Sequence, residues 1–477
     1  MKSTLSVLLI GLAVTAAPAV YARPQLGSKE YNSLKKEALR AVATRQYGTL
    51  RSALQSLAAD DSDRVLELMA DLVTAAPEVF EAAVEAAASM SSDDVTETMQ
   101  KRIERGGTKP SEKIFYVEVA ARRGGQVAVD ALNAAMQAYK RQPQVSRAAV
   151  QLIESQKLVK CVDGLIDLLG ELEGSRDEDS LLTTQTRDAL VGITGETFAT
   201  AELYRSFWAP RKAKFRPVTG KKKSWEGTSE RKRPTFFGSE IKSNRIVFVI
   251  DVSGSMHAAD PPPRQRTGRS GRGPATGGKD GEKPPESTSR VRIDRAKFQL
   301  AQAIKALPPQ AKFTILAYSG AQFPPGSAQG GDPDALLPPK IGGFEWLQIW
   351  SNKLTTASDR GKSSAMGWIE QLKANGSTFT YNALRAAFEV DGADSIVLLS
   401  DGVPAEIDRA TGGPMTPDQI LKKIEAINRF KRLRIDTFGF DGGGRAAIPG
   451  FGGADGGLSE FMQDLAKQNG GAYTPIR

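Results

Sequence analysis

The segment at residues 245–256, RIVFVIDVSGSM, constrains this chain more than any other. Its apolar, mostly β-branched run at 246–250 predicts a strand that is buried on both faces, as in a parallel sheet. The run ends in Asp251, and the hydroxyls of Ser253 and Ser255 follow it. Residues just past such a strand lie in the crevice where open α/β sheets bind ligands. A carboxylate and two hydroxyls are oxygen donors, so the segment predicts a site for a hard cation.

Strand and helix patterns alternate from residue 245 onward, which indicates βαβ units. The helix expected at 417–430 has Thr416 as its N-cap and Pro417 in its first turn. We therefore predict a doubly wound α/β domain over residues 240–477. Its further strands are expected at 312–319, 343–350, 395–400, 433–440 and 472–476, and its helices at 293–306, 363–374, 382–389, 417–430 and 458–468.

Two more motifs follow the first in the same domain. Asn375-Gly376-Ser377-Thr378 precedes a predicted helix, and the apolar strand at 395–400 ends directly before Asp401 and Gly402. Together with D-x-S-x-S, these motifs resemble the metal-ion-dependent adhesion site of von Willebrand factor type A domains, in the family's order and structural contexts. The resemblance implies a metal site made of Asp251, Ser253, Ser255, Thr378 and Asp401.

This resemblance also implies a function. The expected cation is Mg²⁺, with Mn²⁺ or Ca²⁺ as alternatives, and Mg²⁺ prefers six oxygen ligands in an octahedron. The hydroxyls of such a site ligate directly, the two aspartates offset the charge directly or through water, and one position is left for water or for a partner's carboxylate. We expect a metal-dependent protein-binding module whose partner presents an Asp or Glu side chain. Ser377 departs from the family pattern, since many members have a second glycine there.

Residues 23–209 form a second region that we predict to be all-helical. Segments such as 63–75 and 127–139 space apolar residues three and four apart, and short breaks separate them. Successive short amphipathic helices predict an α-solenoid of HEAT type, with a plain helical bundle as the alternative. The stretch at 186–198, followed by Tyr204 and Trp208, resembles the end of HEAT-like repeats in exported bacterial proteins.

The N-terminal residues 1–22 have the pattern of a signal peptide. Lys2 gives a positive start, residues 5–14 are apolar, and small residues stand before a cleavage point at Ala22. We expect export to the periplasm or the cell exterior, with an uncleaved membrane anchor as the alternative. No other segment is long and apolar enough to span a bilayer.

Two polar stretches interrupt the chain. Residues 210–239 are rich in Lys and Arg, and we interpret them as a solvated basic linker. A polyanion-docking patch is the alternative, but nucleic acid is not the expected partner because only Phe215 and Trp225 could stack on a base. Residues 257–290 are rich in Pro, Gly, Arg and Ser, which predicts a disordered insertion beside the metal site. We interpret it as a tolerated surface insertion, with a gating or partner-capturing element as the alternative.

The near-absence of two residue types excludes several classes of function. The chain has one histidine, His257, and one cysteine, Cys161, so catalytic triads, His-based zinc sites and disulfides within the chain are not expected. Cys161 stands in an apolar pattern typical of a buried core thiol. We predict that the protein is not an enzyme. The alternatives are a metal-assisted hydrolase and a helical scaffold in which the metal is structural. The sequence leaves the partner's identity and the oligomeric state open.

Overall fold

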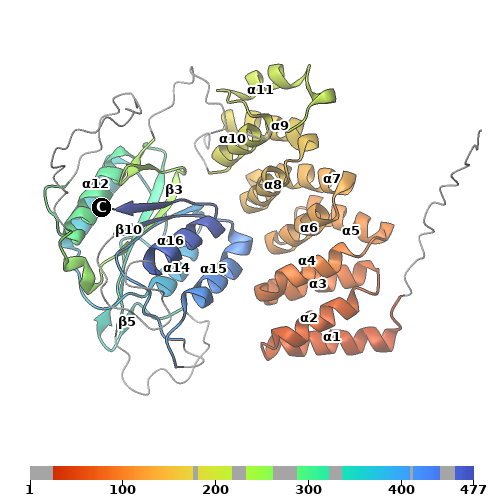
Figure 1. Cartoon of the computed structure of the whole chain (residues 1–477), viewed down its shortest axis with the longest axis horizontal. Helices are drawn as coiled ribbons and strands as arrows, with labels where there is room; N and C mark the ends of the chain where they lie inside the picture. Colours follow the sequence, from red (N-terminus) through yellow and green to blue (C-terminus); the bar gives the residue numbers. More distant parts are fainter. Residues whose placement is uncertain are drawn as a thin grey trace, which may run out of the picture.

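The computed structural model describes residues 25–175, 181–217, 233–260, 287–321, 336–408, 412–440 and 457–476. Figure 1 shows two parts, a stack of helices from the N-terminal half and an α/β domain from the C-terminal half. The predicted signal segment at 1–22, the middle of the basic linker at 218–232 and most of the predicted insertion, 261–286, lie outside the described residues. No helix within the described ranges is long and apolar enough to cross a membrane.

The N-terminal part is all-helical, as predicted. Helix α3 spans Asp63–Ala75, the range expected from its apolar periodicity, and Cys161 is buried in the core of this part. Its elements are α1 (Ser28–Ala43), α2 (Tyr47–Leu57), α3, η1 (Pro77–Val79), α4 (Phe80–Ala88), α5 (Asp93–Glu104), α6 (Pro110–Arg123), α7 (Gly125–Met136), η2 (Gln137–Lys140), α8 (Pro143–Gln156), η3 (Val159–Cys161), α9 (Val162–Glu173), α10 (Leu181–Thr194), α11 (Ala201–Trp208) and η4 (Lys212–Lys214).

These helices form two rows. The even-numbered helices α2 to α10 contact one another in order, and the odd-numbered helices α1 to α11 do the same. Each row packs against the other through the helix pairs that are adjacent in sequence. Contacts restricted to near neighbours are the property of a solenoid, in which each repeat buries its apolar face against the next. The packing therefore favours the predicted solenoid over a plain bundle.

A seven-stranded mixed sheet forms the centre of the C-terminal domain. Its strand order is β11 (Tyr473–Ile476), β10 (Arg434–Phe440), β9 (Ser395–Ser400), β3 (Arg245–Asp251), β4 (Lys312–Tyr318) and β7 (Leu347–Ile349), and β8 (Thr355–Thr356) also pairs with β4. The strands from β11 to β4 are parallel, whereas β7 and β8 run antiparallel to β4. Residues 246–251 of the central strand β3 are buried, as predicted.

Helices cover both faces of this sheet, so the domain is doubly wound as predicted. The helices α12 (Arg292–Ala306) and α13 (Asp359–Gln371) pack on one face. The helices α14 (Thr380–Phe388), α15 (Pro417–Lys431) and α16 (Gly457–Gln468) pack on the other. The hairpins β1 (Thr235–Phe236) with β2 (Ser239–Glu240), and β5 (Lys340–Ile341) with β6 (Phe344–Glu345), lie outside the main sheet.

Three local features differ from the sequence prediction. Helix α13 begins at Asp359 rather than at residue 363, because the Ser358 hydroxyl caps it by accepting the Gly361 N–H (3.3 Å). It also ends earlier, since Leu372 leaves the helical conformation. Residues 235–239, assigned to the basic linker, form β1 and the start of β2, and Phe236 is fully buried in the α/β core. The segment expected as one strand at 343–350 is divided between β6 and β7.

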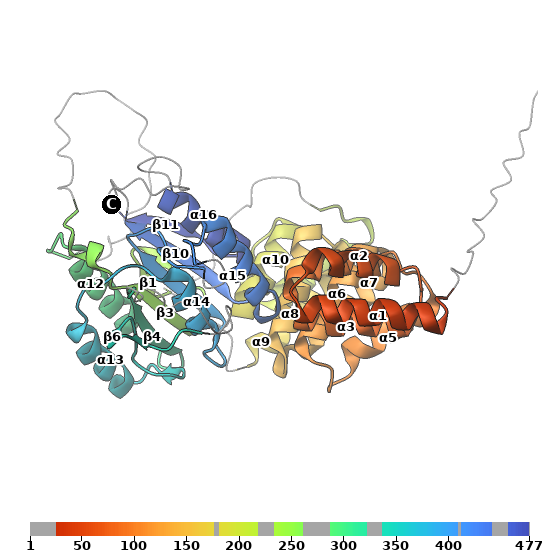
Figure 2. The same ribbon diagram turned by 90° about the horizontal axis from the view of Figure 1, so that it is seen from below.

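The two parts of the chain meet at the C-terminal end of α15, which Figure 2 shows between the sheet and the helical stack. This end carries both charged and aromatic side chains that contact the solenoid. Their pairings are Arg429 with Glu81 (2.6 Å), Arg432 with Glu118 (2.5 Å), and the ring of Phe430 with that of Phe80 (5.5 Å between centroids). A second contact joins α10 to the segment before β3, where the Thr184 hydroxyl donates to the carbonyl of Lys242 (3.2 Å) and Asp188 pairs with the Lys242 ammonium (3.6 Å).

Candidate metal centre

The carboxyl ends of two neighbouring parallel strands bring the two aspartates together. Asp251 is the last residue of β3, and Asp401 directly follows β9. The register pairs Ile250 with Leu399, so both strands end at the same edge of the sheet. Parallel strands place their ligand-binding residues at this edge. The pairing of β3 with β9 thus brings Asp251 and Asp401 close together although they are far apart in the sequence.

A third segment joins this edge through backbone hydrogen bonds. The Gly254 N–H donates to the carbonyl of Gly376 (2.9 Å), and the Ser377 N–H donates to the carbonyl of Gly320 (3.1 Å). These bonds tie the loop before α14 to the turn after β3 and to the end of β4. Thr378 follows in this loop and is buried. The structure therefore brings all three predicted motifs to one place.

Hydrogen-bonded oxygen atoms link the D-x-S-x-S motif to Asp401. The hydroxyls of Ser253 and Ser255 lie 3.0 Å apart, and the Ser255 hydroxyl donates to Asp401 Oδ1 (2.6 Å). Ser255 is exposed, whereas Ser253 and Asp401 are buried. The array therefore reaches solvent on the Ser255 side.

Asp251 lies at the inner end of the array and is fully buried. Its Oδ1 accepts the Ser253 N–H (2.7 Å), and its Oδ2 accepts the Ser400 hydroxyl (2.7 Å). Burial, and secondly the charge of Asp401, raise the pKa of Asp251 above its ordinary range. Two carboxylates withdrawn from water in this way are stabilised by a cation between them. Sequence reasoning missed Ser400, although the last residue of β9 lies beside the end of β3.

Gly402 shows that the space between the hydroxyls has no room for a further side chain. A Cβ atom on this residue would lie 3.1 Å from Thr378 Oγ1 and 3.7 Å from Ser255 Oγ. The Thr378 and Ser255 hydroxyls therefore flank the same small space. With Ser253, Asp251 and Asp401, these residues give the candidate site three hydroxyls and two carboxylates, a set that suits Mg²⁺. The residues present fit the ion that the sequence implies.

The described residues contain no cluster of three or more His, Cys, Asp or Glu side chains that could hold a metal ion. The array at Asp251 and Asp401 is of a different kind, because most of its donors are hydroxyls. Neutral ligands leave more positive charge on a bound cation than carboxylates do. Such a site suits the binding of an external anion better than it suits a closed structural role.

An ion-pair network that the sequence did not predict adjoins the site. The buried Arg292 donates from Nη1 to Asp401 Oδ2 (2.8 Å) and from Nε to Asp260 Oδ1 (2.9 Å), and Arg295 also pairs with Asp260. Asp260 stands at the beginning of the predicted insertion, whose two ends are joined by a bridge between Ala259 and Val291. The base of the insertion is thus fixed to the metal centre through Arg292.

The single histidine has a different place from the one expected. His257, assigned to the disordered insertion, ends the short helix η5 (Gly254–His257) that follows the D-x-S-x-S turn. Its Nε2 lies 3.0 Å from the carbonyl oxygen of Ala374, so this nitrogen is the donor of the pair.

A further buried carboxyl lies behind the site. Glu406 is 1% exposed, and its Oε1 accepts the backbone N–H groups of Tyr381 and Asn382 at the start of α14. Its Oε2 has no hydrogen-bond partner in the described part of the chain. Burial raises the pKa of Glu406 to about 8, and the charge of Asp251 adds to this effect, although the two backbone hydrogen bonds oppose it. Burial thus favours the neutral form of Glu406 in the folded protein.

Comparison with known proteins identifies the kind of domain. Residues 244–266 and 340–474 match the family model of the von Willebrand factor type A domain. The human von Willebrand factor A domain-containing protein 3A is 26% identical over 129 residues, 27% of this chain and 9% of that protein. The human protein 3B is 25% identical over 124 residues, 26% of this chain and 8% of that protein. The match thus spans less than a tenth of the length of these curated relatives.

Two solved structures overlap about half of the chain. A von Willebrand factor type A protein from Catenulispora acidiphila is 18% identical, with a TM-score of 0.29 over 49% of this chain and 38% of that one. An aerotolerance-related membrane protein from Bacteroides fragilis, solved with multiple mutations to serines, is 16% identical, with a TM-score of 0.27 over 49% of this chain and 90% of that one. The family match and the sheet topology show that the C-terminal domain is a von Willebrand factor type A-like α/β domain.

Proposed function

We propose that the type A-like domain is a metal-dependent protein-binding module. Asp251, Ser253, Ser255, Thr378 and Asp401 would hold Mg²⁺, which when bound supplies a Lewis-acidic position for a carboxylate oxygen. The occupant of that position would be an Asp or Glu side chain of a protein partner. This chain's own residues would orient the site and leave it open at Ser255, the exposed member of the set.

The observation that supports this proposal is the hydroxyl array between two buried carboxylates. The oxygens of Ser253, Ser255 and Asp401 follow one another within 3.0 Å, and Gly402 leaves the space beside Thr378 free of a side chain. Arg292 already neutralises part of the charge of Asp401, so the array offers a cation less negative charge than two unpaired carboxylates would. A partner's carboxylate would add the missing negative charge.

Metal binding by the full chain tests the site. We expect Mn²⁺ to bind with one-to-one stoichiometry in calorimetry after chelator treatment, and to be displaced by Mg²⁺. Asp401→Asn and Ser255→Ala should each weaken binding at least tenfold. The matched control is Asp464→Asn, because Asp464 is exposed on α16 and far in sequence from the motifs. Equal affinity in Asp401→Asn and Asp464→Asn would overturn the assignment.

Capture of a carboxylate requires a separate measurement. With Mn²⁺ bound, acetate should show paramagnetic broadening of its methyl signal, because its carboxylate takes the open position. The same broadening of the acetate signal with metal-free protein, or with excess chloride added as a competing anion, would refute capture. In that case the metal would be structural and the solenoid would be the interaction surface, which is the scaffold alternative.

The proposal does not include hydrolysis. His257, the chain's only histidine, shares its Nε2 with the Ala374 carbonyl, and the carboxyls nearest the site serve as its donors. Incubation of the Mg²⁺-loaded chain with phosphate-ester and peptide substrates should therefore give no turnover. A rate that Asp251→Ala abolishes would establish the hydrolase alternative instead.

We also propose that the protein acts outside the cytoplasm, on the basis of the signal pattern at residues 1–22. The mass of the chain purified from envelope or medium should correspond to a start at Arg23. A full-length chain that fractionates with the cytoplasm would contradict export.

A further inference from the structure

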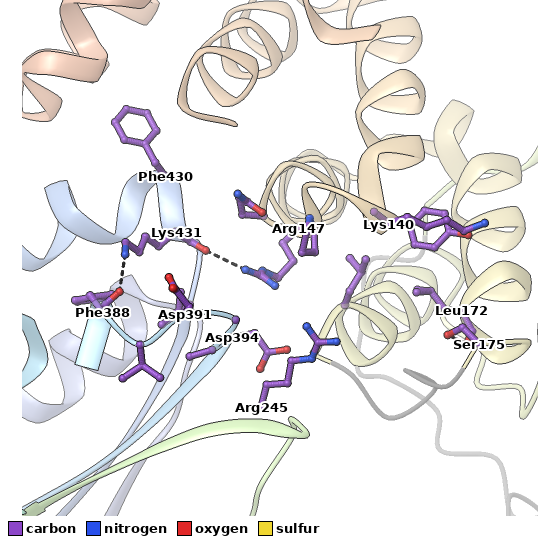
Figure 3. A pocket seen from close by; sticks show the side chains of 18 residues that line it. Lys140, Arg147, Leu172, Ser175, Arg245, Phe388, Asp391, Asp394, Phe430 and Lys431 are labelled. Carbon is purple, nitrogen blue, oxygen red and sulfur yellow. Dashed lines mark hydrogen bonds between the residues drawn. The ribbon is translucent and has the colours of Figure 1, made fainter. Parts of the chain in front are cut away.

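A cavity of about 570 Å³ lies between the solenoid and the α/β domain (Figure 3). Arg245, the first residue of β3, and Asp394, which directly precedes β9, both line it. The cavity is therefore at the amino ends of the strands whose carboxyl ends carry the candidate metal centre. The length of the strands separates the cavity from that centre.

Positive charge predominates in the lining of this cavity. Cationic side chains come from both parts of the chain, and the carboxylates come from the turn before β9 alone. The cations are Lys140, Arg147, Arg245 and Lys431, and the carboxylates are Asp391 and Asp394.

Arg147 is the most constrained of these cations. It projects from α8, is 5% exposed, and donates from Nη2 to the backbone carbonyl of Lys431 (3.0 Å), as Figure 3 shows. Its Nε has no partner within the described ranges. Burial lowers the pKa of Arg147, and the charge of Asp394 offsets only part of that effect. A buried guanidinium with an unused donor is stabilised by an additional anionic acceptor.

Two carboxylates face four cationic side chains in this lining. Asp394 is buried, accepts a hydrogen bond from the Ser243 hydroxyl, and lies in the field of both Arg147 and Arg245. Asp391 is exposed to solvent at the mouth of the cavity, where its charge is screened.

Apolar side chains form the rest of the wall. They come from both parts of the chain, so the cavity has a cationic region and an apolar region side by side. These residues are Leu172, Leu182, Phe388, Val390, Phe430 and Leu433. A mostly apolar pocket with a few converging polar groups is the usual form of a site for a small organic ligand.

We propose that this cavity binds a small organic anion, with its carboxylate or phosphate group at Arg147 and Arg245 and its apolar body against the leucine and phenylalanine side chains. Guanidinium groups suit both oxyanions because their planar donors match two acceptor oxygens at once. Because Arg147 comes from α8 and Arg245 from β3, the bound anion holds the solenoid and the α/β domain in a fixed relation.

Calorimetry on the full chain in the presence of a chelator tests this proposal, with phenyl phosphate, benzoate and phenol as probes. We expect at least one of the two anions to bind at least tenfold more tightly than phenol, which has the same ring without the charged group. The tighter anion identifies the head group. Failure of both anions to bind, or affinities equal to that of phenol, would overturn the proposal.

Variants locate the site. Arg147→Gln should lower the affinity for the tighter anion at least tenfold, and Lys140→Gln, at an exposed position on the rim, should lower it two- to fivefold without affecting folding. Arg51→Gln is the matched control, because Arg51 is exposed on α2 away from the cavity. Unchanged affinity in both Arg147→Gln and Lys140→Gln would place the anion elsewhere and refute the inference.

Discussion

Replacing Glu406 with glutamine should remove a pH dependence of stability that this single buried carboxyl imposes on the α/β domain. In the folded protein the pKa of Glu406 is about 8, whereas the ordinary pKa of a glutamate side chain is 4.5. Between these two pH values the folded state binds more protons than the unfolded state. Stability therefore falls as pH rises through this window, and it is highest below pH 4.5 as far as this group is concerned.

The magnitude follows from the same two values. Since one pH unit of pKa difference corresponds to about 1.4 kcal/mol, full ionisation of buried Glu406 costs about 5 kcal/mol. Between pH 6 and pH 8 the linkage relation gives a loss of about 2 kcal/mol. Glutamine is similar in shape, still offers a carbonyl oxygen to the Tyr381 N–H, and cannot titrate.

The assay is urea unfolding of the metal-free chain at pH 6 and at pH 8, followed by tryptophan fluorescence. At pH 6 we expect the free energies of unfolding of Glu406→Gln and the wild type to agree within about 2 kcal/mol. Between pH 6 and pH 8 the difference should shift by about 2 kcal/mol in favour of Glu406→Gln. Asp251 titrates in both proteins, so its contribution largely cancels in the difference. Glu370→Gln, at an exposed position of α13, is the control and should show no such gain. A difference between wild type and Glu406→Gln that is independent of pH would refute the reasoning.

Three further substitutions test other parts of the structure. Gly402→Ala should weaken Mn²⁺ binding at least tenfold in calorimetry, because its Cβ would lie 3.1 Å from Thr378 Oγ1, while the urea midpoint stays close to wild type. Arg292→Met should destabilise the metal-free chain by about 3–5 kcal/mol, because it removes the buried guanidinium that two buried carboxylates, Asp260 and Asp401, share. Mg²⁺ should then raise its melting temperature more than it raises that of the wild type, and an equal rise would contradict the network. Arg432→Glu should loosen the docking of the two parts, and adding Glu118→Arg should restore it, as measured by small-angle scattering; failure of the double variant to recover would refute the pairing.

Local patterns were sufficient to predict most of the α/β domain. The apolar run at 246–250 is the buried core of β3, the run at 395–400 is β9, and α15 begins at Pro417 with Thr416 capping it by accepting the Gln419 N–H. Such signals are readable because a strand or a cap is decided by residues a few positions apart. The predicted bounds of α13 lay too far toward the C-terminus. The prediction followed an apolar pattern that continues past the end of the helix and did not use the N-cap at Ser358.

Some residues of the candidate site could be recognised from sequence motifs, and others were placed there only by tertiary packing. The sequence indicated the predicted donors, because the D-x-S-x-S segment follows a buried strand and, with the two later motifs, resembles the type A adhesion site. Ser400, Arg292 and Glu406 carry no such local signal. They became part of the site or its surroundings only when strand pairing and helix packing brought distant segments within hydrogen-bond distance.

The relation between the two parts of the chain was decided by the tertiary structure alone. Composition and periodicity determined that a helical solenoid precedes an α/β domain, because both are set by short-range apolar spacing. Nothing in the sequence indicated that the end of α15 docks on the solenoid, or that Arg147 and Arg245 line one cavity. Those contacts join residues far apart in the sequence, and their geometry depends on the curvature of the helix stack and the twist of the sheet rather than on any local pattern.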